Sequence, residues 1–313
     1  MKPISKSDFM MFLKHPAWLW LRKHDPDKIP PVDEQAQALF DAGFLFESYA
    51  EKLFPGAVRL GFNNFNEYSS LPLRTEQAIS SGAKVLLQAR FEKDGYTCIS
   101  DVIEILDNKL FNLYEIKSSS SVKPEHSIDL AFQVMVIESL GYKINQINVI
   151  HVNSEYVRNG EIDPRQLSTT TDMTEQVRSQ AALVATEAPH ALAIVNSDVI
   201  PDPSPSLTQL GAFGEYMRTF RNLKELPEYS IYDLVTVGAA RIGKLEELGI
   251  LEITEIPDDF EGLTAKQQAQ IEATKRNRPL IDSDKIKEFL GKLKYPLYFL
   301  DYETYSSVIP FFD

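Results

Sequence analysis

The chain has 313 residues, 43% of them hydrophobic and 11% aromatic, which fits about two folded domains rather than disorder. With 32 Lys and Arg against 45 Asp and Glu the net charge is −13, which argues against a protein that coats polyanions non-specifically. A nuclease needs only a local basic groove, so that class stays open. Cys98 is the only cysteine, which excludes a disulfide framework, a zinc ribbon or a four-thiolate cluster within one chain. No apolar run reaches the ~18 residues of a membrane helix, and the N-terminus lacks a signal-type apolar region, so we expect a soluble, cytoplasmic protein without membrane contact.

Two helices are predicted at the N-terminal end. Residues 5–22 (SKSDFMMFLKHPAWLWLR) have helical apolar spacing, with Ser5 or Ser7 as N-cap and a break or kink at Pro16. A long helix follows over residues 34–53 and is stopped by Pro55-Gly56. Glu47 lies inside its apolar pattern. Since a bare carboxylate is costly to bury, Glu47 is expected to be paired, to bind a metal or to point outward.

The pattern then changes to strands. Residues 84–92 and 96–106 are rich in β-forming residues and are separated by Asp94-Gly95, a hairpin signal. Residues 110–117 form the third strand of this meander. Asp101 is an acid within an apolar strand, and Glu115 and Lys117 lie two apart, on one face of the next. A structural ion pair is one interpretation; two carboxylates on adjacent strands beside a lysine favour a functional site.

A second α and β stretch completes the expected core. A helix over residues 127–140, with Gln133 on or beside its apolar face, leads into a buried strand over residues 143–152 and then a helix capped by Thr171 or Thr174. The order is therefore α-α-β-β-β-α-β-α. This is an α/β fold.

The C-terminal third has a different composition. Residues 198–207 hold three prolines and are typical of a linker. Residues 234–250 predict short helices around a glycine-rich turn, and a further helical segment lies within residues 253–275. Residues 295–301 (YPLYFLD) predict an apolar strand. Because a strand without partners is not a domain, we expect the chain to be the N-terminal part of something longer or a clipped form.

The carboxylates suit one kind of chemistry. Phosphodiester hydrolysis needs an activated water and neutralisation of developing charge, and Mg²⁺ or Mn²⁺ held by Asp and Glu oxygens can provide both. Asp101 and Glu115 are candidate ligands, and Lys117 can orient the water or stabilise the charged transition state. Glu47 is a possible further acid, and the backbone carbonyl of Ile116 a possible further ligand.

The spacing of Asp101, thirteen residues and then Glu115-Ile116-Lys117 resembles the signature of the PD-(D/E)XK nuclease superfamily. The N-terminal helix, Glu47 at the end of GFLFE and Gln133 in DLAFQVMVIESLG make the likeness closest to the RecB-like branch, which includes CRISPR-associated exonucleases. The resemblance implies a restriction-endonuclease-like core, a mixed sheet flanked by helices, over about residues 1–200. It also implies roles: Glu47, Asp101 and Glu115 as metal ligands, Lys117 as catalytic, and Gln133 as positioning the site or the DNA.

Some family features are absent. Ile137 stands where the glutamine motif often has a tyrosine, and Ser100 replaces the proline of the signature. Many relatives hold a [4Fe–4S] cluster. Here His15 occupies the place of its first cysteine and the other cysteines are lacking, so we predict no iron–sulfur cluster.

The C-terminal parts carry two weaker resemblances. LEELGILEITEIP is similar to helix-hairpin-helix-like segments, and FLDYET resembles the first motif of RNase H-like DEDD exonucleases, with Asp301 and Glu303 as would-be ligands. The predicted domains are therefore residues 1–200, a linker and small helical module at 201–280, and the truncated start of an exonuclease-type domain at 281–313. This second, incomplete site is expected to be inactive.

These observations predict a metal-dependent nuclease that hydrolyses DNA at ends or in single strands. One alternative is a degenerate nuclease fold that binds nucleic acid or protein as a scaffold. Another is an RNA-directed enzyme. Cleavage polarity, endonuclease or exonuclease action and protein partners stay open.

Overall fold

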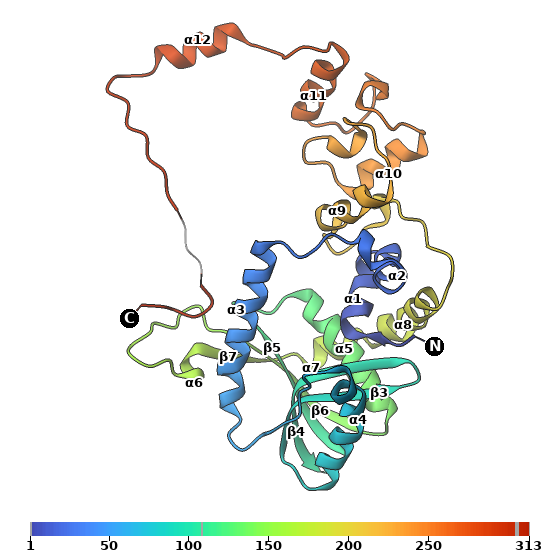
Figure 1. Ribbon diagram of the computed structural model, residues 1–313. Helices are drawn as coiled ribbons and strands as arrows, with labels where there is room; N and C mark the ends of the chain where they lie inside the picture. The colour runs from blue at the N-terminus through green and yellow to red at the C-terminus, as the bar shows by residue number, and fades with distance from the viewer. Residues whose placement is uncertain (1, 108, 304–306, 313) are drawn as a thin grey trace. The chain divides into compact units, whose positions relative to one another are not determined.

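The computed structural model describes residues 2–107, 109–303 and 307–312 (Figure 1). The chain divides into two compact units, one of residues 1–202 with 307–313 and one of residues 203–306. In the described part of the chain, no helix has the length and apolar character needed to cross a membrane.

A mixed seven-stranded sheet forms the centre of the first unit. The expected core is present and the predicted fold class is confirmed: three antiparallel strands, a helix, and a strand parallel to the third. The strands are β1 (Ile4–Ser5), β2 (Val58–Arg59), β3 (Val85–Lys93), β4 (Tyr96–Asp107), β5 (Leu110–Lys117), β6 (Lys143–Val152) and β7 (Ser168–Asp172). The helices are α1 (Lys6–Lys14), α2 (Pro16–His24), α3 (Glu34–Ala50), α4 (Phe65–Ser80), α5 (Pro124–Ser139), α6 (Pro164–Leu167), α7 (Thr174–Ser179) and α8 (Ala181–Val195).

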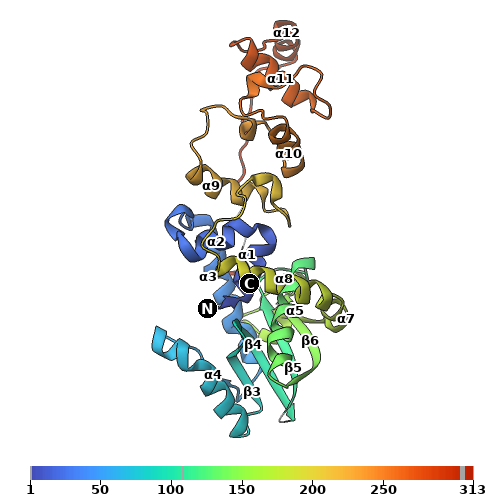
Figure 2. The same cartoon turned by 90° about the vertical axis from the view of Figure 1, so that its right-hand side faces the viewer.

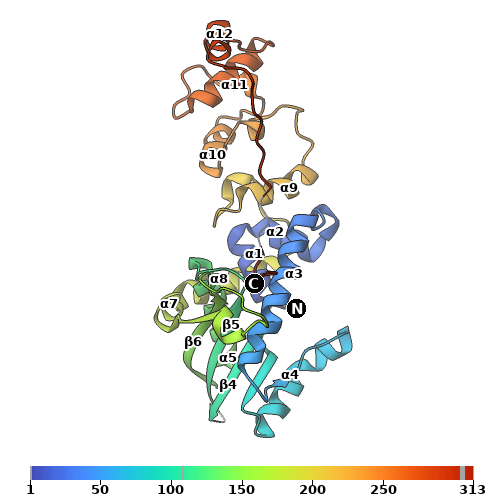
Figure 3. The same cartoon turned by 90° about the vertical axis from the view of Figure 1, so that its left-hand side faces the viewer.

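Helices cover both faces of this sheet. Figure 2 shows α5 and α8 toward the viewer, and Figure 3, from the opposite side, shows α3 there. The larger apolar cluster, the α5-side core, joins α1, α5 and α8 to the sheet through residues such as Phe9, Leu113 and Phe132. The smaller, the α3-side core, contains Phe46 and Val102.

Several local signals act as expected. Ser5 caps α1 and forms a capping box with Asp8, and the helix breaks at Pro16, which starts α2. Asp94 and Gly95 both have left-handed φ, 50° and 86°, as a tight two-residue hairpin with a right-handed twist needs. The long helix α3 ends in a 3₁₀ turn, η2 (Glu51–Leu53).

Other elements differ from the prediction. The sequence reading contained no helix at α4, which tolerates Pro72 in its interior. It expected a helix capped by Thr171 or Thr174, whereas residues 168–172 form β7 against β6 and α7 begins at Thr174 with Met173 as its N-cap. Residues 295–303 form neither helix nor strand, and the side chains of Tyr298 and Phe299 are each 90% exposed. A strand forms only with a partner, and YPLYFLD has none among the described residues.

The second unit is a small helical assembly. It contains α9 (Phe213–Leu223), α10 (Ala239–Glu247), α11 (Ala265–Lys275) and α12 (Ser283–Gly291), with η3 (Pro205–Leu207), η4 (Ile231–Asp233) and η5 (Ile253–Glu255) between them. Tyr216, Ile242 and Ile253 are fully buried in it. Gln267 holds its turns together by donating to the carbonyl of Val235 at 2.9 Å and accepting from Arg241.

Candidate active site

The site begins where β4 and β5 separate. The two strands pair from Asp107 and Leu110 to Val102 and Tyr114, and not beyond. From there β5 stays with β6 as far as Lys117 and His151. Asp101 Oδ2 instead accepts a hydrogen bond of 2.8 Å from the backbone N of Ile116. A side chain therefore bridges the two strands at the point where the backbone ladder ends.

A backbone irregularity at the same level aims the side chains. Gln88 in β3 has φ 58°, a left-handed value that is uncommon for a residue with a Cβ. In a regular strand Leu87 and Ala89 would lie on the same face. Here Leu87 belongs to the α3-side core and Ala89 to the α5-side core. The alternation thus reverses at Gln88, and the amide of Gln88 lies at the mouth of the site between α3 and β4.

Glu115 is the most enclosed carboxylate of the site, with 2% of its surface exposed. Its Oε1 accepts from Lys117 Nζ at 2.7 Å and from Lys6 Nζ at 2.5 Å. Its Oε2 accepts from Gln133 Nε2 at 2.8 Å. The Oε1 of Gln133, which is completely buried, accepts from Ser100 Oγ at 2.9 Å. Gln133 therefore fixes one oxygen of Glu115 and is itself fixed by β4.

Asp129 balances the second lysine charge. Its Oδ2 lies 2.9 Å from Lys117 Nζ and 3.9 Å from Lys6 Nζ. The two ammonium groups thus sit between two carboxylates contributed by β5 and α5. Asp129 Oδ1 is buried without a hydrogen-bond partner, so the cluster keeps unused acceptor capacity.

Lys6 reaches this cluster because the start of the chain enters the sheet. β1 runs parallel to β4, with Ile4 opposite Tyr96 and Ser5 opposite Thr97. It therefore pairs with the part of β4 that β5 has left. Lys6 follows at the first position of α1, directly after the N-cap residue Ser5.

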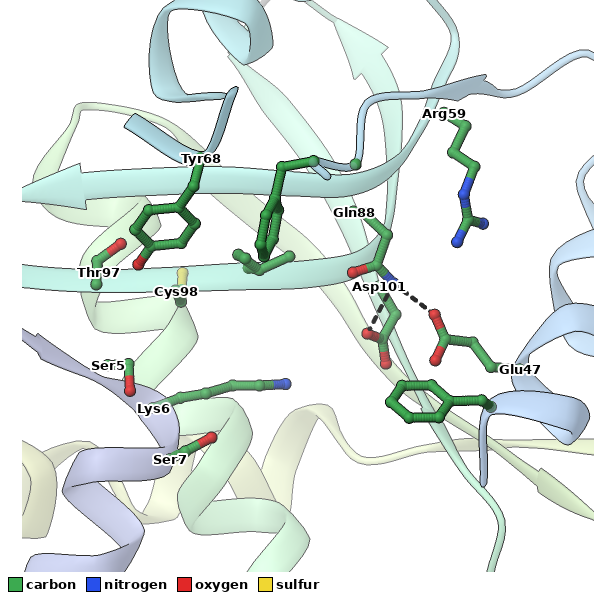
Figure 4. A pocket seen from close by; sticks show the side chains of 14 residues that line it. Ser5, Lys6, Ser7, Glu47, Arg59, Tyr68, Gln88, Thr97, Cys98 and Asp101 are labelled. Carbon is green, nitrogen blue, oxygen red and sulfur yellow. Dashed lines mark hydrogen bonds between the residues drawn. The ribbon is translucent and has the colours of Figure 1, made fainter. Parts of the chain in front are cut away.

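Glu47 approaches from the other side of the sheet on α3. It is linked to Asp101 through Gln88, whose Nε2 lies 2.6 Å from Glu47 Oε1 and 3.4 Å from Asp101 Oδ1. Figure 4 shows this amide between the two carboxylates, with Lys6 reaching in from the far wall. The three candidate acids come from three different elements, Glu47 from α3, Asp101 from β4 and Glu115 from β5. They line or adjoin one pocket of about 480 Å³.

The two central carboxylates have opposite electrostatics. Burial and the negative charge of Glu115 raise the pKa of Asp101 to about 7. Burial would also raise the pKa of Glu115, but the ammonium groups of Lys117 and Lys6 hold it well below its usual range. Burial and the nearby charge of Glu51 raise the pKa of Glu47. Negative charge at Glu47 and Asp101 is thus incompletely compensated within the protein.

The lysines remain cations despite being mostly enclosed. Burial alone would lower the pKa of Lys117, but Glu115 and Asp129 raise it well above its usual value. Asp129 and Glu115 do the same for the pKa of Lys6. Both groups are therefore suited to donating hydrogen bonds to an anion, and neither is suited to act as a base.

The donor set fits a hard divalent cation. Glu47, Asp101 and Glu115 provide only oxygen ligands, which Mg²⁺ and Mn²⁺ prefer. N–H and C=O of one strand residue point to the same side, so the carbonyl of Ile116, like its N–H, points toward β4 and Asp101. As the side chains lie, the described residues contain no group of three or more His, Cys, Asp or Glu in mutual position to hold a metal; Gln88 and the two lysines occupy the space between the acids.

Sequence reasoning missed Lys6, Gln88 and Asp129. Lys6 lies in a helix whose apolar pattern predicts packing on the core and indicates no role for the lysine. The Ser5–Asp8 capping box does mark where that helix starts. Asp129 lies in a helix whose apolar periodicity predicts its core face but indicates no role for its acidic residues. Nothing in the sequence signals the left-handed backbone of Gln88.

His15 and the single cysteine, Cys98, have structural roles. His15 is fully buried, and its Nδ1 accepts a hydrogen bond of 3.1 Å from the backbone N of Ala17 at the start of α2. Cys98 is buried in the α5-side core, and burial raises the pKa of its thiol to about 12.

The residues of the second predicted site, Asp301 and Glu303, belong to the second unit. Asp301 and Glu303 are both exposed, and Asp301 Oδ1 accepts a hydrogen bond of 2.9 Å from the neighbouring backbone N of Tyr302. Thr304, which belongs to the same motif, lies outside the described residues.

No family model and no curated protein matches the sequence. Among the solved structures that are similar to part of it are two exonucleases. An alkaline exonuclease from Laribacter hongkongensis is 11% identical, with 71% of this chain and 95% of that one covered and a TM-score of 0.27. A phage-related exonuclease from Haemophilus somnus is 13% identical, with 63% and 96% covered and a TM-score of 0.25. At such low values the functional conclusion depends on the geometry of the site.

Proposed function

We propose that this protein is a metal-dependent nuclease of the RecB-like PD-(D/E)XK type that hydrolyses DNA at ends or in single strands. The observation that carries the proposal is the meeting of Asp101, Glu115 and Lys117 where β4 and β5 separate, beside a pocket. The lysine lies 2.7 Å from Glu115, and Asp101 binds the backbone between them.

Asp101, Glu115, Glu47 and the carbonyl of Ile116 would hold the metal. Bound Mg²⁺ or Mn²⁺ supplies a Lewis acid for a phosphate oxygen and lowers the pKa of a water molecule. Gln133 keeps Glu115 oriented by fixing its Oε2. Such preorganisation of a ligand by a buried partner is common in metal sites.

Lys117 acts as a cation in this proposal. Its ammonium group is protonated and is held by Glu115 and Asp129 at the edge of the site. From there it can donate a hydrogen bond to a phosphate oxygen as negative charge develops, or orient the attacking water. Lys6 provides a second positive charge on the same carboxylate.

The domain assignment belongs to the same proposal. We assign residues 1–200 to the nuclease domain, residues 201–280 to a linker and a small helix-hairpin-helix-like module, and residues 281–313 to a segment that resembles the start of an exonuclease-type domain. Asp301 and Glu303 form an incomplete, inactive second site there. The protein acts in the cytoplasm and without an iron–sulfur cluster.

A binding or scaffold function is the second candidate. It is favoured by the pairing of both Glu115 oxygens with Lys6, Lys117 and Gln133, which satisfies this carboxylate without a metal. An RNA-directed enzyme would use the same site, and only its choice of substrate would differ.

Cleavage of end-labelled strands in Mn²⁺ tests the proposal. We expect wild-type protein to cut single-stranded DNA, and Lys117→Ala to be slower by about 10²–10³-fold, the usual loss when one charge-stabilising donor is removed. Lys93→Ala is the matched control, since Lys93 is exposed at the end of β3. Duplex DNA and RNA of the same sequence, run in parallel, define the substrate. Equal cleavage by wild type and Lys117→Ala would place the activity elsewhere and contradict the proposal.

A further inference from the structure

Aromatic side chains form part of the wall of the same pocket. Phe44 of α3, Phe62 of the loop before α4 and Tyr68 of α4 line it together with Lys6 and Asp101. Phe44 is 68% exposed and Phe62 is 47% exposed. Large apolar rings left open beside the half-buried carboxylates of Glu47 and Asp101 add little to the folding of the unit. They are available to a ligand.

Phe62 is held in place from behind. Its ring packs edge-to-face on Tyr68, with centroids 5.0 Å apart and an interplanar angle of 68°. The guanidinium of Arg90 lies 3.8 Å from the centroid of the Tyr68 ring. Arg90 is 4% exposed and donates to Thr97 Oγ1 at 2.9 Å and to the Tyr68 carbonyl at 2.7 Å. Phe62 thus presents an open ring on a rigid support, which reduces the entropy lost on binding.

The pocket also contains a permanent cation. Arg59 of β2 lines it, with 56% of its side chain exposed. The hydrogen bond that Arg59 donates to Glu51 raises the pKa of this guanidinium. In Figure 4 Arg59 lies on the side of Gln88 and Glu47, and Tyr68 lies across Gln88 from it. An aromatic support and a cation in one groove match the alternating bases and phosphates of a nucleic-acid strand.

We propose that Phe62 stacks on a base of an unpaired strand and so makes this nuclease specific for single-stranded ends. Tyr68 and Arg90 position Phe62, and Arg59 contacts a phosphate. In a duplex both faces of an internal base are already stacked, so an isolated ring can take up only an unpaired base. The pocket volume of about 480 Å³ lies in the range of small-ligand pockets, ~300–1,000 Å³, which is large enough for a nucleotide. The inference rests on the proposed function, because it names the substrate of that site.

Binding of strands with and without bases tests the inference. The protein carries Lys117→Ala, so that the probe is not consumed, and fluorescence anisotropy follows a labelled oligothymidine and an abasic strand with the same phosphates. We expect the parent to bind the thymidine strand more tightly. Phe62→Ala should lose about 5- to 100-fold of this affinity, the usual size of one stacked base, and bind the abasic strand as before.

Two further variants separate stacking from other effects. Phe62→Trp keeps a flat ring and should keep the preference for bases, whereas Phe62→Leu keeps apolar volume and should lose it. Phe65→Ala is the matched control, because Phe65 is 78% exposed beside Tyr68 but does not line the pocket. Thermal unfolding of each variant checks that it is folded.

The outcomes distinguish this inference from the nuclease function. If the parent binds both strands equally, or Phe62→Ala retains the preference for bases, the stacking role of Phe62 is refuted even if Mn²⁺-dependent cleavage is intact. If Phe62→Ala loses the preference while the Lys117-intact protein never cleaves, the strand-binding surface stands and the nuclease function fails.

Discussion

The region around Glu115 and the segment around Asp301 contain the same residue types but differ in every physical respect. Glu115 is 2% exposed and receives hydrogen bonds from two lysines and an amide. Asp301 and Glu303 are exposed, in a stretch without helix or strand. Around an exposed carboxylate, water and salt screen the charges of neighbouring residues. The comparison teaches that an acidic motif becomes a site only when a sheet and its helices enclose it.

The largest expected effect tests the enclosed carboxylates. Asp101→Asn and Glu115→Gln each remove a ligand charge, and we expect each to abolish Mn²⁺ binding in calorimetry and to slow cleavage by about 10²–10³-fold. Asp301→Asn should leave both unchanged. If Asp101→Asn binds Mn²⁺ with the wild-type affinity, the comparison breaks and the scaffold function gains support.

A second prediction concerns the stability of the enclosure. Gln133→Leu removes the hydrogen bonds of Gln133 to Glu115 Oε2 and Ser100 Oγ, and a buried polar group that loses its partner costs about 1–3 kcal/mol. We expect Tm to fall by roughly 5–15 °C for a unit of this size. Gln176→Leu, at an exposed position of α7, should change Tm little. A Tm of Gln133→Leu equal to that of the control would mean that the buried amide network is dispensable.

A third, smaller effect is a dependence of metal-free stability on pH. The pKa of Asp101 is raised to about 7 in the folded protein by burial and by Glu115, above its value of about 3.9 in an unfolded chain. Between these values the folded state binds more protons than the unfolded state, so the free energy of unfolding falls as pH rises. Asp101→Asn should flatten this slope. Urea unfolding in EDTA at pH 5 and pH 7.5 measures the change in the free energy of unfolding with pH. An equal change in wild type and Asp101→Asn would contradict a raised pKa of Asp101 in the folded protein.

The smallest effect is expected in the exposed segment. The double variant Asp301→Asn, Glu303→Gln should change the free energy of unfolding by less than about 0.5 kcal/mol, as is usual for surface positions, and should not alter cleavage. Thermal unfolding and the Mn²⁺ cleavage assay check both statements. A loss of activity would reveal a role that exposure alone does not suggest.

Much of the central fold could be predicted from local patterns. The strands at residues 110–117 and 143–152 have the bounds that the sequence predicts, because dense apolar residues lie between clear turn signals. β1 and β2, of two residues each, carry too little pattern to be recognised. β7 (STTTD) has no apolar alternation, since it is an edge strand whose side chains are largely outside the core.

The candidate site was predictable only in part for a similar reason. Asp101, Glu115 and Lys117 lie on neighbouring strands, so strand spacing alone brings them together. Lys6 comes from 109 residues before Glu115, and its approach depends on β1 filling the gap beside β4. Gln88 depends on a local reversal of the strand. Long-range pairing and backbone irregularity are tertiary effects that periodicity does not encode.

The pairing of β1 with β4 also has a consequence for the order of folding. Loop closure over such distances is slow, because chain entropy must be lost before any contact forms. Because β1 pairs with β4, we expect Lys6 to reach Glu115 only once the meander has formed and the start of the chain has returned to the sheet. We therefore expect Lys6 to join Lys117 on Glu115 late in folding, so that a partly folded chain holds Glu115 with Lys117 alone.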